Sequence, residues 1–277
     1  MVLLRSLPLA FSRAFILFLF DFVGYRIGIR KDVARTQLKH VFPKWDEQTI
    51  NSTLKGIYRH MALNIVDEYL VNDADLNARS EIIGMENMQK AMDMKHGVIL
   101  ATAHFGNWEA ARILPLKGIP LSVITKKQRN TLFDNYTNYI RQRSGVRIID
   151  MRKGLRDIVQ DLSEQRVIAI LADQNAGGRG LILDFLGYPA SNWKGVAKLS
   201  LRYQVPIVPG FVVRSPDDKL VFEFSDIIYH PELTDKEENY PLVLSEIIAV
   251  TESYIRRHPD HWFWVHKRWK HGYDMFP

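Results

Sequence analysis

The amino-acid sequence predicts an α/β fold with a mostly parallel or mixed central sheet flanked by helices. Two observations carry this prediction. Four short apolar runs, at 98–102, 121–124, 167–172 and 207–213, have the length and composition of strands buried on both faces. Segments with helical patterns separate them, at 108–116, 131–143, 154–164 and 194–203. Such alternation is typical of parallel sheets with helices packed on them. A later run at 221–224 indicates an antiparallel addition.

Two further segments have readable periodicity. Between 47 and 70, apolar residues recur at helical spacing and predict one long amphipathic helix; they are Ile50, Leu54, Ile57, Met61, Ile65 and Tyr69. Near the C-terminus, Trp262, Trp264 and His266 alternate, which predicts a strand with one aromatic face in the core. A membrane interface is the alternative for these tryptophans. Because single-residue gaps separate the histidines here and cations surround them, we expect no metal site.

The N-terminal segment is densely apolar but interrupted. Arg5, Pro8, Arg13 and Asp21 break the apolar run in residues 1–24, and its longest uninterrupted stretch, 14–20, is far shorter than a bilayer span. No small-x-small cleavage site follows, so a signal peptide is not expected. We predict an amphipathic or partly inserted helix, with a tilted span and a buried core helix as alternatives. The expected organisation is a membrane-anchoring segment, 1–30, followed by a single α/β domain, 31–277.

The formal charge of +6 is concentrated at one end of the chain. Residues 1–60 contain ten Lys/Arg and four Asp/Glu, whereas the remainder contains 27 of each kind. A basic surplus beside an apolar anchor favours an anionic membrane surface as a partner, although a solvated helix face would have the same composition. No recognition motif suggests nucleic acid. Cysteine is absent, which excludes disulfides, thiolate metal sites and a cysteine nucleophile.

The segment GVILATAHFGNWEAAR, residues 97–112, contains the candidate catalytic residues. His104 follows the predicted strand directly, Gly106 permits a tight turn, and Asn107 is a good N-cap for the next helix. Five positions on a regular helix are about 140° apart. Glu109 can therefore reach the imidazole only if the chain turns at 105–106. We predict that it does, so that Glu109 orients His104 and stabilises the imidazolium.

Histidine is the side chain best suited to remove a proton near neutral pH. A hydroxyl cannot readily attack a thioester unless a base takes its proton, and backbone N–H groups at the helix start could stabilise the oxyanion. The alternative is a structural histidine at a strand end. The position of His104 after a strand, the glycine turn and the spaced Glu109 together favour the catalytic role.

Four sequence blocks resemble the lipid A biosynthesis (Kdo-dependent lauroyl/myristoyl) acyltransferase family, within the glycerolipid acyltransferase superfamily. The first is AHFGNWE, with His104 and Glu109. The others are ADQNAGGRG at 172–180, followed by Phe185, Gly187 and Pro189, then VPIVPGFVVR at 205–214, and HPDHWFWVHKRWK at 258–270. The resemblance extends from about residue 5 to 271. A bare His-x-x-x-x-Glu is weak, but its surroundings make the resemblance specific.

The resemblance implies a role for each matching residue. His104 would be the general base and Glu109 its acidic partner, with Asn107 and Trp108 in the same loop. Lys126, Arg179 and Arg214 would occupy the places of the basic residues that bind phosphates or the donor, and Asp173 and Gln174 belong to the second block. Two departures from the family pattern favour a different acceptor headgroup: Asn175 follows Asp173-Gln174 where the family often has aspartate, and Lys126 replaces a frequent arginine.

Apart from the family resemblance, the pattern of residues itself predicts that Asp173 and Gln174 end a strand, and that this strand lies beside the one that precedes His104. The loop 177–180 after them lets backbone and Arg179 approach a phosphate, although Arg179 could equally be a surface loop charge. Without Gly-Lys-Ser/Thr this loop is no P-loop.

The implied function is transfer of an acyl group from an acyl carrier protein or coenzyme A thioester to a hydroxyl of a membrane glycolipid. The expected acceptor is a lipid A precursor in lipopolysaccharide biosynthesis, and the expected place is the cytoplasmic face of a bacterial inner membrane. No cofactor is expected. Other acceptors stay open: a phosphatidylinositol mannoside, a lysophospholipid or an aminolipid. A non-catalytic lipid-binding protein and a thioester hydrolase are further alternatives, although no Gly-x-Ser-x-Gly elbow occurs.

Overall fold

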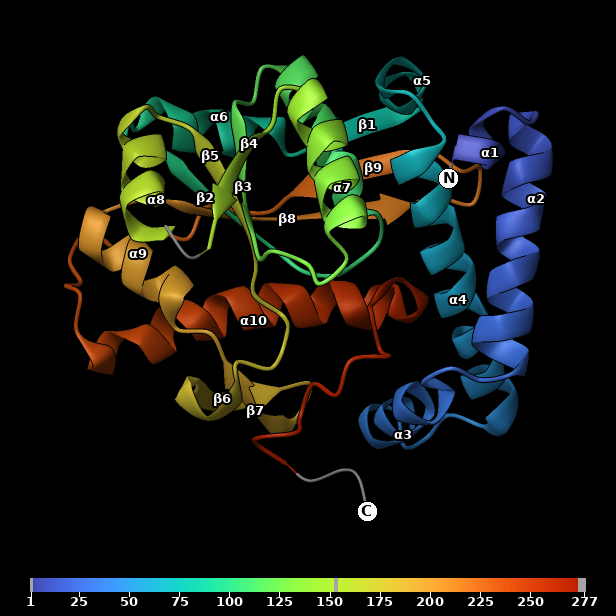
Figure 1. Ribbon diagram of the computed structural model, residues 1–277. Helices are drawn as coiled ribbons and strands as arrows, with labels where there is room; N and C mark the ends of the chain where they lie inside the picture. The colour runs from blue at the N-terminus through green and yellow to red at the C-terminus, as the bar shows by residue number, and fades with distance from the viewer. Residues whose placement is uncertain (1, 152–153, 274–277) are drawn as a thin grey trace.

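The computed structural model describes residues 2–151 and 154–273, and it has one central sheet with helices on both sides (Figure 1). The sheet has seven strands in the order β1-β9-β8-β2-β5-β3-β4. Neighbouring strands run parallel except β8 and β9, which are antiparallel. The strands are β1 Ser80–Ile83, β2 Val98–Thr102, β3 Leu121–Thr125, β4 Arg147–Asp150, β5 Val167–Leu171, β8 Ile207–Arg214 and β9 Leu220–Phe224. A separate antiparallel pair consists of β6 Leu181–Phe185 and β7 Tyr188–Asn192.

Helices and helical turns connect the strands. The α-helices are α1 Val2–Arg5, α2 Leu9–Leu19, α3 Lys31–Val41, α4 Glu47–Tyr69, α5 Asp73–Ala78, α6 Met85–Asp93, α7 Thr131–Arg143, α8 Gly154–Ser163, α9 Gly195–Tyr203 and α10 Tyr240–Arg257. A π-helix, η1 Phe20–Arg26, continues α2. Short 3-10 segments are η2 Trp108–Lys117, η3 Gly177–Arg179, η4 Glu237–Asn239 and η5 Pro259–His261.

The central strands are buried on both faces, and their side chains alternate between two cores. Val98 and Leu100 of β2 pack on one face with residues of η2, α4 and α6. Ile99 and Ala101 pack on the other face with residues of α8, α9 and α10. The predicted α/β class, the four strands and the antiparallel addition are therefore confirmed, although β3 is buried only at its first two residues.

The N-terminal helices lie along α4 at one side of the molecule (Figure 1). Ser12 and Ile16 of α2 are buried, while Phe11, Phe15 and Phe18 are exposed. Residues 11, 15 and 18 share one face of a helix, so α2 is amphipathic, as predicted. No helix within residues 2–151 and 154–273 combines the length and the apolar character needed to cross a membrane. The division into segments 1–30 and 31–277 stays a prediction.

The tryptophan-rich C-terminal segment is core, but it is not a strand. Trp262, Trp264 and Trp269 are each at most 3% exposed and pack with residues of α3 and α4. The predicted burial is confirmed. The predicted strand is wrong, because this segment forms one isolated bridge, Trp262 with Phe105, and otherwise turns. The indole rings of this segment are buried by packing against helices, and such packing does not require the backbone to pair with a strand.

Candidate active site

His104 lies two residues beyond the carboxyl end of β2, where the backbone is held on both sides. The Phe263 N–H donates to the His104 carbonyl at 3.0 Å, and the Gly106 N–H donates to the His261 carbonyl at 2.8 Å. Gly106 has φ +53°, and a Cβ there would lie 1.6 Å from the Val212 carbonyl oxygen of β8. Only glycine fits this approach. The chain therefore turns at 105–106, as predicted.

The imidazole of His104 has a partner on each nitrogen. Its Nδ1 lies 2.8 Å from Asp173 Oδ1, and its Nε2 lies 3.3 Å from the side-chain nitrogen of Gln174. The pairing of β2 with β5 brings these residues together, because Thr102 is opposite Leu171 and both chains continue in the same direction. The expectation that Asp173 and Gln174 end a strand beside that of His104 is confirmed. Since a carboxylate only accepts, Nδ1 carries the proton and Nε2 is the basic nitrogen.

Asp173 is buried and both of its oxygens accept hydrogen bonds. Besides His104, the Trp262 indole N–H donates to Oδ2 at 2.8 Å. Burial by itself would raise the pKa of Asp173, but the positive charge and hydrogen bond of His104, with the hydrogen bond of Trp262, outweigh burial and lower it. Asp173 is therefore an anion that holds the orientation of the ring.

The same contact acts on His104 in the opposite direction. Burial would lower the pKa of His104, but the charge and hydrogen bond of Asp173, followed by the charge of Glu109, raise it above the ordinary 6.5. His104 thus belongs to a carboxylate–imidazole pair, and its Nε2 is a stronger base than that of a free histidine.

Glu109 does not have the predicted place beside the ring. Its carboxylate instead forms a two-pronged pair with Arg141 of α7, at 2.6 Å and 3.0 Å, and accepts from the Trp108 indole at 3.2 Å. The direct contact between His104 and Glu109 that the sequence predicted does not form, and this prediction is corrected. Asp173 orients the ring instead. The physical reason is that the planar guanidinium of Arg141 binds both oxygens of Glu109. Glu109 affects His104 through its charge.

A groove of about 850 Å³ opens in front of His104. Its walls come from α4, η2, α7 and the segments after β3 and β5. Besides His104, Trp108 and Glu109, its lining includes Glu68, Lys126, Phe133, Arg141, Met151, Gln174, Asn175 and Trp193. Behind it lies a narrower hollow of about 80 Å³ on the β2–η2 face of the sheet. Trp108, Glu109 and Arg141 line both spaces, and the inner hollow is otherwise mainly apolar, with Leu100, Ala111, Leu114 and Phe222 among its residues.

Comparison with known protein families shows which enzymes this chain is related to. The model of the family described as bacterial lipid A biosynthesis acyltransferase matches residues 1–271. The chain belongs to this family. The family resemblance of the four sequence blocks is confirmed, and the chain is an acyltransferase.

Individual relatives are distant in sequence, and the lipid A acyltransferases among them align with most of the chain. A lipid A biosynthesis acyltransferase of Haemophilus influenzae is 24% identical over 253 residues, 88% of this chain and 76% of that protein. The lipid A biosynthesis lauroyltransferase of Escherichia coli is 23% identical over 87% of this chain and 79% of its own length. A phosphatidylinositol mannoside acyltransferase of Mycobacterium tuberculosis is 26% identical over 46% of this chain and 42% of its own. A crystal structure of the 1-acyl-sn-glycerophosphate acyltransferase from Thermotoga maritima aligns with TM-score 0.40 and 13% identity, covering 88% of this chain and 97% of that one.

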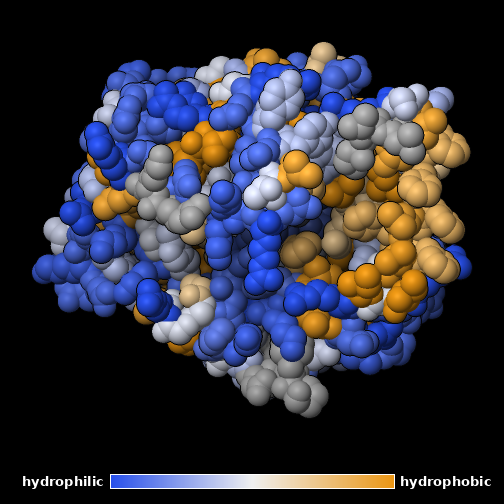
Figure 2. Space-filling model, in the orientation of Figure 1, coloured by the Kyte–Doolittle hydropathy of each residue, from blue (hydrophilic) through white to orange (hydrophobic). Residues whose placement is uncertain are grey.

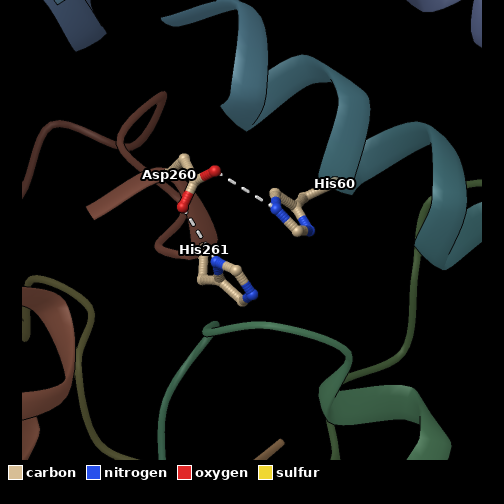
Figure 3. Close-up of side chains that lie close together, drawn as sticks. All are labelled: His60, Asp260 and His261. Atoms are coloured by element: carbon tan, nitrogen blue, oxygen red, sulfur yellow. Dashed lines mark hydrogen bonds and ion pairs between the residues drawn. The ribbon is translucent and has the colours of Figure 1, made fainter. Parts of the chain in front are cut away.

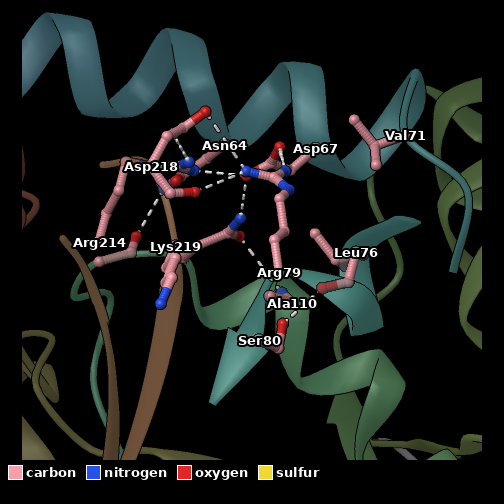
Figure 4. Close-up of polar contacts among 12 residues, drawn as sticks. Asn64, Asp67, Val71, Leu76, Arg79, Ser80, Ala110, Arg214, Asp218 and Lys219 are labelled. Atoms are coloured by element: carbon pink, nitrogen blue, oxygen red, sulfur yellow. Dashed lines mark hydrogen bonds and ion pairs between the residues drawn. The ribbon is translucent and has the colours of Figure 1, made fainter. Parts of the chain in front are cut away.

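Among the residues expected to bind substrate in this acyltransferase, two have structural roles instead. Asn107 is 1% exposed; its oxygen accepts from the Ala110 N–H, and its amide donates to Asp67. Arg214 is also buried, between Asp67 and Asp218 (Figure 4). Both expectations are corrected, because neither side chain reaches the groove. The arginine that ends β8 neutralises carboxylates of the fold rather than a ligand.

Lys126 and Arg179 differ in their positions. Lys126 follows β3, is exposed, and lines the groove. Arg179 ends the exposed turn η3 and is not among the residues that line the groove. Trp108 and Gln174 do line it.

Some of the backbone N–H groups that were expected to stabilise an oxyanion at the start of η2 already donate hydrogen bonds within the protein. The N–H groups of residues 105, 106 and 107 donate to carbonyls of residues 103, 261 and 212. Trp108 and Glu109, in the first turn of η2, are in the position where helices lack internal acceptors.

Sequence reasoning missed two residues of the groove. Arg141 lies on α7, where its charge looks like any helix-surface charge, and only the fold brings it to Glu109. Glu68 is the last residue but one of α4, and burial, followed by the negative charge of Glu109, raises its pKa to about 8. Glu68 lines the groove beside Glu109 and Arg141, and its raised pKa favours the protonated form more than in a free glutamate. The helical pattern of α4 gave no signal for this, because glutamate near a helix end is common.

One group of side chains outside the groove has the spacing of metal ligands. His60 of α4, Asp260 and His261 of η5 converge in Figure 3, with His60 Nε2 at 3.3 Å and His261 Nδ1 at 2.9 Å from Asp260 oxygens. Both distances suit a His–Asp–His hydrogen-bond chain. This chain connects α4 to the segment that supports Gly106, and His261 Nε2 is already bonded to the backbone of Arg214. The arrangement is explained by support of the His104 loop.

Proposed function

We propose that this acyltransferase moves a fatty acyl group from an acyl carrier protein or coenzyme A thioester to a hydroxyl of a lipid A precursor. The observation that carries the proposal is the basic Nε2 of His104 at the wall of the groove, with Nδ1 paired to the buried Asp173 at 2.8 Å. This geometry gives a histidine base whose protonated form a nearby anion stabilises.

In the proposed reaction, His104 Nε2 takes the proton of the acceptor hydroxyl as its oxygen bonds to the thioester carbonyl carbon. The tetrahedral oxyanion would accept hydrogen bonds from the Gln174 side chain, which the bound hydroxyl releases from Nε2, and from the first N–H groups of η2. Collapse breaks the carbon–sulfur bond. The leaving thiolate then takes the proton from His104, which returns the imidazole to its starting state.

The groove and the inner hollow share lining residues, and each has a character that suits one of the two substrates. The inner apolar hollow beside Trp108 suits the hydrocarbon of the donor, because it lies directly behind the groove and its lining is mainly Leu, Ile, Val, Ala and Phe side chains. The wider groove, with Lys126 and Glu68 in its lining, suits the polar acceptor headgroup and the thioester end of the donor. Membrane attachment through the exposed apolar face of α2 would bring this groove to the cytoplasmic surface of the inner membrane.

Acyl transfer to a phosphatidylinositol mannoside is a second candidate, because acyltransferases named for that lipid align with nearly half of this chain. The two candidates share the chemistry at His104 and differ in the headgroup. A panel of labelled donors with both glycolipids, analysed by mass spectrometry of the products, separates them.

The catalytic test is His104→Ala compared with His230→Ala, a histidine on the loop before α10. We expect His104→Ala to lower the transfer rate about 10²- to 10⁴-fold, because the base is lost. His230→Ala should transfer at the normal rate, and both variants should keep the thermal unfolding temperature and vesicle binding. Near-normal turnover by folded His104→Ala would refute the proposed mechanism.

A further inference from the structure

A second hollow, of about 290 Å³, lies beside the groove and is lined by cations. Arg30 comes from the chain between η1 and α3, while Lys267 and Lys270 come from the C-terminal segment. His266, His271 and Asn175 complete the polar lining, and none of the described residues that line it is acidic. Three full positive charges around one concave site favour an anion with several oxygens.

Backbone contacts hold Arg30 at this site. Arg30 has φ 59°, a left-handed conformation, and its Nη1 donates to the Val265 carbonyl at 2.8 Å. That contact leaves the other guanidinium N–H groups for a ligand, and the structure gives them no partner among the described residues. The preceding Ile27 and Ile29 are 65% and 57% exposed. Arg30 therefore lies where an apolar surface ends and a cationic one begins, which is the level of lipid headgroups at a membrane surface.

Asn175 connects this hollow with the groove of His104, because it lines both spaces. Its Oδ1 accepts from the Gly177 N–H at 2.7 Å and lies 3.0 Å from His271 Nδ1. Its Nδ2 is buried and has no hydrogen-bond partner among the described residues. A buried amide donor without a partner is costly unless a ligand or water accepts from it.

His266 contributes shape rather than charge. Burial lowers its pKa below the ordinary value; Asp173 opposes this, and the positive charges of His104, Arg268 and Arg30 add to the lowering. Its Nε2 accepts from the Asn175 backbone N–H at 3.2 Å, which also requires an unprotonated nitrogen. The cationic character therefore rests on Arg30, Lys267 and Lys270.

We propose that this hollow binds a phosphate group of the acceptor headgroup while the acceptor hydroxyl lies at His104. The inference rests on the proposed function and names the part of the acceptor that this acyltransferase recognises. The position beside exposed Ile27 and Ile29 favours a lipid headgroup over the donor, and Asn175, which lines both spaces, shows that the hollow adjoins the groove where the reacting hydroxyl would lie. The phosphate selects and orients the acceptor, and it takes no part in the transfer itself.

The experiment compares a phosphorylated lipid A precursor with the same glycolipid after phosphatase treatment. Binding is measured by tryptophan fluorescence in detergent micelles, and transfer is measured with labelled donor. In Arg30→Gln/Lys270→Gln we expect at least a tenfold weaker affinity and a tenfold higher KM for the phosphorylated glycolipid only. Wild type should bind the treated glycolipid about as weakly as the double variant does, and the KM for the donor should not change.

The matched control is Lys90→Gln/Lys198→Gln, which removes the same charge from exposed positions on α6 and α9; it should behave as wild type. Lys270→Glu serves as a second variant, because Lys270 is exposed and its replacement should leave the fold intact.

Equal affinity of wild type for both glycolipids would overturn the inference, as would a raised donor KM or equal inhibition by inorganic phosphate with both acceptors. Selective binding of the phosphorylated glycolipid without any transfer would contradict the proposed function and leave the inference standing.

Discussion

At the level of single residues, two carboxylates influence His104 in different ways. Asp173 touches the ring and determines which nitrogen carries the proton, whereas Glu109 is paired with Arg141 and acts through its charge. From the sequence we predicted one carboxylate partner for His104, and the residue predicted was Glu109, which is nearer to His104 along the chain than Asp173 is. Contact between His104 and Asp173 depends instead on the register of β2 and β5.

The two carboxylates are distinguished by the pH dependence of kcat/KM. His104 must be neutral to act as a base, so activity should fall as the pH drops through its raised pKa, above 6.5. Asp173→Asn removes the largest contribution that raises this pKa. The acid limb should therefore move to lower pH, and the maximal rate should fall about 10²-fold or more because the ring loses its anionic partner.

Glu109→Gln is the matched comparison, since it removes one negative charge without breaking the bond to Nδ1. It should shift the acid limb in the same direction by a smaller amount. An Asp173→Asn profile that coincides with that of wild type would show that the pair does not control the base.

At the level of elements, α2 and η1 combine two surfaces that the sequence could not separate. One side packs on α4 through Ile16 and Gly24, and a Cβ on Gly24 would lie 2.5 Å from the Tyr58 ring. The other side exposes a row of phenylalanines, and it forms the apolar region at the right of Figure 2. The buried side has the features of a core helix, and the exposed apolar side has the features expected of a membrane-associating helix.

Replacement of the exposed phenylalanines tests the membrane role of α2. Phe11 and Phe18 are 59% and 62% exposed, so Phe11→Ser/Phe18→Ser should leave the unfolding temperature nearly unchanged. Burying a phenylalanine in an apolar medium contributes about 1.5–3 kcal/mol. Partial insertion of two rings therefore predicts an affinity for anionic vesicles lowered about 10- to 100-fold, measured by co-sedimentation. Leu242→Ser on α10 is the control and should bind as wild type; unchanged binding by the double variant would exclude α2 as the anchor.

At the level of the whole molecule, five strands and η2 together determine the shape of the inner hollow. Its lining comes from β2, β3, β5, β8 and β9 on one face of the sheet, and Ala111 and Leu114 of η2 cover it. Gly210 of β8 belongs to this wall, and a Cβ there would lie 2.7 Å from Leu100 Cδ1. The depth available to an acyl chain is thus a property of the packed sheet and of no single motif.

Filling this hollow should change the preferred donor. Ala111→Leu adds three carbons to the lining, so we expect longer acyl donors to lose about tenfold in kcat/KM relative to shorter ones, a ratio equivalent to about 1.4 kcal/mol. A series of donors of graded chain length gives the measurement. Ala176→Leu, in the groove but outside the inner hollow, is the control. An unchanged chain-length profile for Ala111→Leu would mean that the hydrocarbon binds elsewhere.

Local sequence pattern alone was enough to predict the fold class of this protein and the position of its candidate base. The length of an apolar run, its alternation with helical segments and the glycine turn after His104 depend on neighbouring residues, and they predicted the strands, the sheet class and the place of the candidate base. The match to family blocks added the enzyme class. The tertiary structure decided the partners: Asp173 instead of Glu109, Arg141 and Glu68 in the groove, and Arg214 buried with Asp67. These contacts join residues 32 to 147 positions apart, and strand register and helix packing, which no local window contains, bring them together.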